Sequence, residues 1–198
     1  MTKYAKFISS TKIEFPPITK GSIINYKINY PMLIEDGYKE LIEIEKPITN
    51  RRYHIEYIET DVITETIVYD ETQEEADTRE LDGAKDIKYQ EALEKANDFE
   101  ENGTVEYKNC VFEMSLSNRQ NLKDTQEALI ALGQETTPWN DKNDEIVELT
   151  LEDIIYIRLN LILARIKTLW IEQYPAYKAQ IELAQTVQEV NAIEIEYN

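Results

Sequence analysis

The chain has 198 residues, 42% of them hydrophobic and 10% aromatic, which is enough for one ordinary domain or two small ones. Its 39 acidic and 21 basic residues give a formal charge of −18, so neither nucleic acid nor an anionic membrane is an expected partner. The single cysteine, Cys110, cannot form an internal disulfide, and the first ten residues lack the apolar stretch of a secretory signal. The cytoplasm is therefore the expected location.

Residues 1–70 predict a small β-rich N-terminal domain. β-branched and aromatic residues alternate there with polar ones, and proline and glycine divide the runs. The clearest element is an antiparallel hairpin with strands at 53–58 and 62–69, joined by a short polar turn.

Residues 71–102 predict an acidic helical connector between two domains. Residues 71–101 contain twelve acidic and four basic side chains, and their apolar residues form only a thin stripe made largely of alanine. Gly83 weakens such a helix by roughly 1 kcal/mol relative to alanine. A disordered acidic linker is the alternative that this composition leaves open.

Residues 103–198 predict a C-terminal α+β domain, which makes the whole chain α+β. Strands at 104–107 and 110–114 form a second hairpin. Ser117 then caps a helix that runs to about Leu132.

This domain is built around one long hydrophobic helix, from Thr150 to about Gln173. Thr150 is its expected cap, with Asp153 reaching back as in a capping box. Polar residues interrupt the isoleucine and leucine run too often for a membrane span. Pro175 is expected to end or kink the helix before a further helical piece, and residues 193–197 alternate like an edge strand.

The apolar belt of this helix is too broad for one amphipathic neighbour to cover. The belt therefore lies either at the centre of its domain or in a subunit interface, in which case the protein is a homo-oligomer. The acidic loop before the helix is interpreted as a structural lid. The residues expected to make the contacts of the belt and of this loop are Trp139, Leu161, Ile162, Ile166 and Trp170.

No catalytic, cofactor or metal site is expected, and the protein is not expected to be an enzyme. His54 is the only histidine, which excludes a multi-histidine metal centre, and the sequence has no glycine-rich phosphate loop. The spacing of a calcium loop is imitated by Asp141, Asn143, Glu145 and Glu152. Ile146 stands where such a loop requires glycine, so a solvated turn is the preferred interpretation.

Two other functions stay open at this point. The many tyrosines of the β-rich domain could stack on sugars, as in a receptor- or carbohydrate-binding module, although tyrosine is also an ordinary strand residue. Paired carboxylates could hydrolyse a glycan if a cleft held them roughly 5 to 10 Å apart, a separation that a sequence does not show.

Two parts of the chain resemble a known family. Residues 3–8 (Lys-Tyr-Ala-Lys-Phe-Ile), 13–17 (Ile-Glu-Phe-Pro-Pro) and 33–39 (Leu-Ile-Glu-Asp-Gly-Tyr-Lys) resemble the start of small tail or tail-fibre assembly proteins of tailed bacteriophages and prophages. Residues 139–170, which contain Trp-Asn-Asp and Val-Glu-Leu-Thr-Leu-Glu-Asp, resemble the C-terminal DUF4376 domain found in such proteins.

This resemblance implies a non-enzymatic role in phage tails. The protein would be either a chaperone that helps fibre or baseplate subunits to assemble or a structural component of the tail. Its expected partner is a tail-fibre or baseplate protein. Its expected location is the host bacterial cytoplasm during assembly or, for a component, the virion tail.

Overall fold

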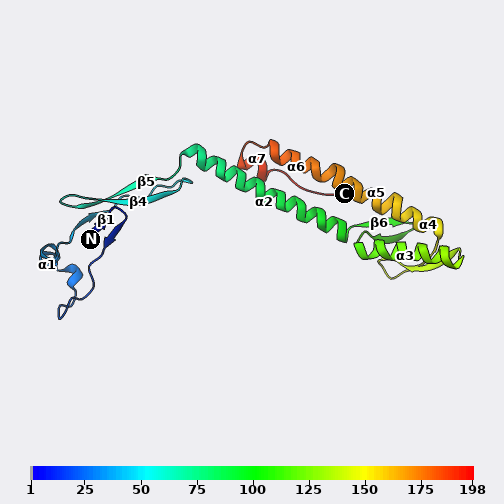
Figure 1. Ribbon diagram of the computed structural model, residues 1–198, viewed down its shortest axis with the longest axis horizontal. Helices are drawn as coiled ribbons and strands as arrows, with labels where there is room; N and C mark the ends of the chain where they lie inside the picture. Colours follow the sequence, from blue (N-terminus) through cyan, green and yellow to red (C-terminus); the bar gives the residue numbers. More distant parts are fainter. Residues whose placement is uncertain (1) are drawn as a thin grey trace. The chain divides into compact units, whose positions relative to one another are not determined.

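The computed structural model describes residues 2–198 and is of the α+β class, as the sequence predicts (Figure 1). Its contacts divide the chain into two compact units, one ending at Arg79 and the other comprising Glu80–Asn198. The helix predicted for the acidic segment is present as α2 (Gln73–Asn102), and the boundary between the units falls inside it. Within residues 2–198, no helix has both the length and the apolar character needed to cross a membrane.

A five-stranded sheet forms the centre of the first unit. Its strands are β1 (Lys3–Ser9), β2 (Lys12–Glu14), β3 (Lys39–Ile42), β4 (Tyr53–Glu59) and β5 (Ile63–Tyr69), in the order β2-β1-β3-β5-β4. The pair β3 and β5 is parallel and the other pairs are antiparallel. The predicted hairpin is therefore confirmed as β4 and β5. The amide of Tyr57 in β4 donates to the carbonyl of Ser10 at 2.7 Å, so the sheet curls until its two ends meet.

Each face of this sheet carries its own apolar cluster. Ala5, Leu41 and Ile63 are buried inside the curl. On the other side, the segment between β2 and β3 contains a short 3-10 turn, η1 (Tyr26–Ile28), and helix α1 (Tyr30–Glu35). A second cluster lies there, built on buried Tyr26, Leu33 and Tyr38.

The second unit begins with the rest of α2. Along the chain, a hairpin, a helix and a second hairpin follow. The elements are β6 (Thr104–Tyr107), β7 (Cys110–Glu113), α3 (Leu116–Leu132), β8 (Thr136–Asn140) and β9 (Ile146–Thr150). The first hairpin was predicted, and its turn residues Lys108 and Asn109 both have positive φ, as a tight hairpin turn requires.

Two sequence predictions in this region were wrong. The cap of α3 is Ser115 rather than Ser117, because the Ser115 hydroxyl accepts from the Asn118 amide at 3.2 Å. The acidic loop that carries Trp139 is largely the hairpin of β8 and β9. Pro138 lacks an amide hydrogen and so weakens the sequence signal for a strand, but β8 pairs on only one side and tolerates it.

One long helix follows Thr150, and the predicted capping box at its start is confirmed. Its helical backbone runs from Leu151 to Leu183 as α4 (Leu151–Tyr156), a π-helical stretch η2 (Ile157–Ile162), α5 (Leu163–Thr168), a second π-helical stretch η3 (Leu169–Gln173) and α6 (Tyr174–Leu183) (Figure 1). Pro175 was predicted to end or kink this helix before a further helical piece; the helix does not end there, and the further piece is α6 with Pro175 in its first turn. Proline is tolerated in the first turn after a change of helix type, where its missing amide costs little.

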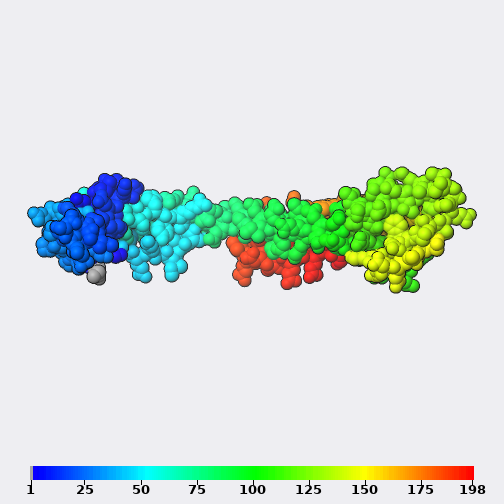
Figure 2. Space-filling model, turned by 90° about the horizontal axis from the view of Figure 1, so that it is seen from below, coloured from blue at the N-terminus to red at the C-terminus, as the bar shows by residue number. Residues whose placement is uncertain are grey.

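The C-terminal residues lie along the groove between α2 and α6, after the short helix α7 (Val187–Asn191). They do not form the predicted strand. Side chains hold their backbone instead: Lys88 donates to the Ile193 carbonyl, Lys95 to that of Ile195, and the Tyr177 hydroxyl bonds both the carbonyl and the amide of Glu196. Figure 2 shows this red segment against the green α2.

Candidate interaction surfaces

The first unit presents isoleucines on the outer face of its sheet. Strand register places Ile42, Thr64 and Ile58 in one row across β3, β5 and β4. Residues in register point to the same side of a sheet, and here Ile42 is 45% exposed and Ile58 is 54% exposed. A sheet face turned to water normally carries polar side chains, so this row marks an uncovered surface.

A hollow of about 390 Å³ lies beside this row. Tyr4 and Glu40, which are partners in β1 and β3, line it, and Glu40 shares its face of the sheet with Ile42 two residues on. Ile34 of α1 stands at the hollow and is 61% exposed. We call the surface formed by Ile34, Ile42 and Ile58 with this hollow the open face.

The second unit has an uncovered apolar surface on its long helix. Tyr156, Leu159, Leu163 and Ile171 are between 43% and 62% exposed. They are three, four and eight residues apart, a spacing that keeps side chains on one side of a helix. We call these four residues the exposed stripe.

The predicted interaction residues lie on the other side of the same helix or pack against it. Ile162 and Ile166 are buried in the main core of the second unit, and Leu161 is partly buried against that core. Trp139 of β8 and Trp170 also pack there, and the Trp170 indole donates to Glu100 of α2 at 2.6 Å. The apolar belt therefore has a core side, which holds these residues, and a free side.

The exposed stripe went unrecognised in the sequence because isoleucine and leucine occur on nearly every side of this helix. Burial, which separates the two sides, depends on where α2, α3 and the β6–β7 hairpin lie. The polar residues at Asn160 and Lys167, which are exposed together with Leu163, were the only available signal.

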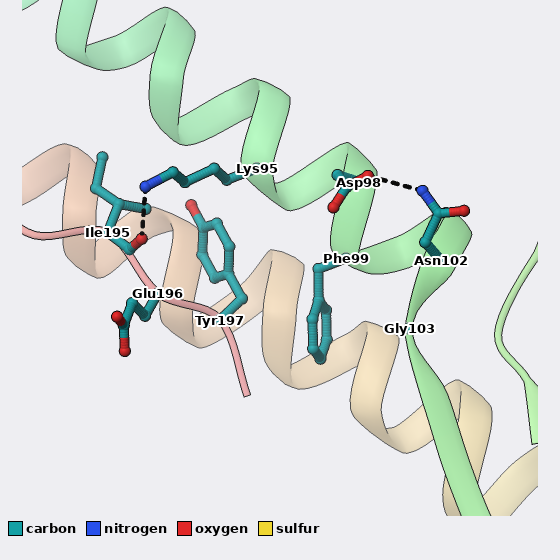
Figure 3. A pocket seen from close by; sticks show the side chains of 8 residues that line it. All are labelled: Lys95, Asp98, Phe99, Asn102, Gly103, Ile195, Glu196 and Tyr197. Carbon is teal, nitrogen blue, oxygen red and sulfur yellow. Dashed lines mark hydrogen bonds between the residues drawn. The ribbon is translucent and has the colours of Figure 1, made fainter. Parts of the chain in front are cut away.

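A groove of about 400 Å³ opens between the end of α2 and the C-terminal segment (Figure 3). Lys95 spans it to reach the Ile195 carbonyl, and Asp98 accepts from Asn102 at 2.7 Å. The rings of Phe99 and Tyr197 lie 6.4 Å apart. Most polar groups around the groove are thus already hydrogen-bonded to other residues of the same unit. The groove is the boundary between two packed segments.

In the loop with calcium-like spacing, backbone amides already occupy the oxygens of Asp141. The Asp141 carboxylate accepts from the amides of Val111, Asn143 and Glu145 at 3.1, 2.7 and 2.9 Å. These bonds lower the pKa of Asp141, that from Val111 most. Glu152 lies apart from this turn, in the first turn of α4. Across residues 2–198, no three acidic, histidine or cysteine side chains are grouped so as to hold a metal ion.

A second buried carboxylate, Asp153, ties the β6–β7 hairpin to the long helix. It accepts from the Tyr107 hydroxyl, the Lys108 ammonium and the Thr150 amide. Burial alone would raise the pKa of Asp153, but the bonds from these donors outweigh it and lower that pKa well below its usual value. The role of this carboxylate is structural.

The remaining sequence candidates lie in the first unit. His54 is exposed on β4, and its Nδ1 lies 2.7 Å from Asp70. This hydrogen bond raises the pKa of His54. Of the tyrosines considered for sugar stacking, Tyr26 and Tyr38 are buried, Tyr4 stacks on Tyr30, and only Tyr69 is classed as exposed.

Comparison of the chain with protein-family models, with curated proteins and with solved structures finds no match.

Proposed function

We propose that this protein is a non-enzymatic, phage tail-associated protein that acts through protein–protein contacts. In this proposal it serves as an assembly chaperone for tail-fibre or baseplate subunits, or as a structural component of the tail, and works in the cytoplasm of the producing bacterium. The setting rests on the resemblance of residues 3–8, 13–17 and 33–39 to the start of tail assembly proteins, and of residues 139–170 to the DUF4376 domain found in such proteins.

The observation that carries the contact function is the open face. Ile34, Ile42 and Ile58 are at least 45% exposed, and Ile34 lines the hollow of this face. Exposed isoleucines gathered on one face of a sheet are typical of a surface that another protein covers. We assign this face to the tail-fibre or baseplate partner.

Co-purification and virion composition test this proposal and distinguish its two forms. The tagged chain, expressed in phage-producing bacteria, is expected to recover a fibre or baseplate protein. Mass spectrometry of purified virions is expected to detect the chain if it is a tail component and to miss it if it is a chaperone. Absence of tail proteins from the purified complex, together with absence of the chain from the virion, would contradict the proposal.

A further inference from the structure

The long helix is balanced in charge although the protein is strongly acidic. The whole chain has a formal charge of −18, and most of its surface therefore repels a second copy. Residues 151–183 contain four acidic residues and four basic ones, namely Glu152, Asp153, Glu172 and Glu182 against Arg158, Arg165, Lys167 and Lys178. The helix itself therefore adds no net repulsion when two copies approach along it.

One pair of the exposed stripe, Leu159 and Ile171, is symmetric about position 165. Laying two copies of the helix antiparallel, with the two-fold axis level with position 165, brings together residues equally distant from that position. The Arg165 side chain itself points away from this axis and donates to the Thr104 carbonyl at 3.2 Å. Leu159 then faces Ile171 of the other copy, and Leu163 faces Lys167. All four residues are exposed within one copy. The aliphatic stem of Lys167 can cover Leu163 while its ammonium stays in water.

The same alignment places opposite charges together at both ends of the stripe. Glu152 and Lys178 are both exposed, and each lies thirteen residues from position 165. Glu152 of one copy therefore meets Lys178 of the other. A parallel pair would set Glu152 against Glu152 and Lys178 against Lys178. Because like charges at such positions repel, the antiparallel arrangement is the favoured one.

We propose that the exposed stripe is the interface of an antiparallel two-fold dimer, and that a second copy of this chain covers it. The interface is isologous, with the same stripe on both protomers. It lies in the second unit and uses none of the residues of the open face, so the dimer does not depend on the proposed phage partner.

Sedimentation analysis of the full chain, with charge reversal, tests the pairing. Wild type is expected to sediment as a dimer. Glu152→Lys alone and Lys178→Glu alone each create two like-charge pairs and are expected to raise the dimer dissociation constant about tenfold. The double variant restores both pairs and is expected to regain wild-type dimerisation. Lys142→Glu, on the exposed turn of the β8–β9 hairpin, is the matched control and should leave the constant unchanged.

Engineered cysteines test whether the two helices run antiparallel. Their readout is disulfide formation and does not depend on the size of a dissociation constant. Ala164→Cys lies beside the axis and is expected to form a disulfide between copies. Two Lys178→Cys residues lie about 40 Å apart along antiparallel helices and are expected to form none, whereas a mixture with Glu152→Cys chains is expected to crosslink. Wild type, with its buried Cys110, supplies the background.

Three results would overturn the dimer. These are a monomeric wild type at the highest concentration measured, failure of the double charge variant to recover, and a disulfide between two Lys178→Cys chains. Circular dichroism of each variant separates loss of dimer from loss of fold.

Discussion

The ammonium of Lys108 lies 2.8 Å from Oδ2 of Asp153, a carboxylate that is only 6% exposed. Lys108 belongs to the turn of the β6–β7 hairpin, and Asp153 is the third residue of the capping box of the long helix. One buried carboxylate therefore fixes both the start of that helix and the position of the hairpin beside it.

We expect Asp153→Asn to lower the free energy of unfolding by about 2 kcal/mol at neutral pH, through loss of the ion pair and weakening of the capping box. The folded pKa of Asp153 is depressed, so its contribution is complete above the unfolded pKa of about 3.9 and is lost as the pH falls towards the folded pKa. Urea unfolding should therefore show the difference between wild type and variant shrinking in acid. A difference independent of pH would argue against this role, and Asp82→Asn on the exposed side of α2 is the control.

Two glycines in or next to α2 should respond in opposite ways to alanine. A Cβ at Gly103 would lie 2.3 Å from the Phe99 carbonyl oxygen, a backbone atom that cannot move aside, so Gly103→Ala should lower stability by roughly 2 kcal/mol. Gly83 has nothing within 4 Å of the added carbon, and Gly83→Ala should raise stability by about 1 kcal/mol. Denaturant unfolding measures both, and equal signs would refute the local geometry.

The pKa of His54 should be raised above its ordinary value by its hydrogen bond to Asp70. Asp70→Asn should lower it again. In the wild type, the bond between His54 and Asp70 stabilises the fold at pH values below the unfolded pKa of histidine. This stabilisation is lost as the pH rises through the folded pKa of His54. Because the chain has one histidine, its ring signals in a proton NMR titration give this pKa without assignment. An unchanged midpoint in the variant would contradict the contact.

Calcium should not stabilise the protein. The oxygens of Asp141, the first residue of the calcium-like spacing, already accept three backbone amides, and a metal ion would have to displace them. Thermal unfolding should have the same midpoint in millimolar calcium and in excess chelator. A higher midpoint in calcium would show that the turn rearranges into a metal site.

Local signals in the sequence were sufficient for several elements. The β4–β5 hairpin, the acidic helix α2, the turn at Lys108 and Asn109, and the capping box at Thr150 all follow from side-chain period or from short-range hydrogen bonding. Each depends on residues close together in the chain, which is why the α+β class could be predicted.

Elements that depend on distant contacts could not be predicted in the same way. The C-terminal segment alternates like a strand, yet Lys88, Lys95 and Tyr177 from α2 and α6 bind its backbone instead of a neighbouring strand. The exposed stripe and the open face likewise appear only when burial is known. For this reason the predicted interaction residues lie on the core side of the long helix or, like Trp139 of β8, pack against that side.

Binding of the partner protein to the open face is the most direct test of the proposed function. The measurement is the affinity of the full chain for the tail-fibre or baseplate protein recovered with it, compared with Ile42→Glu, Ile58→Glu and Ile48→Glu. The third isoleucine is fully exposed in the same unit but lies outside the open face, so its variant is the control. We predict that the first two variants bind at least about tenfold more weakly and the control binds like wild type. Equal affinity of all four proteins, or no affinity of wild type for any tail protein, would contradict the account.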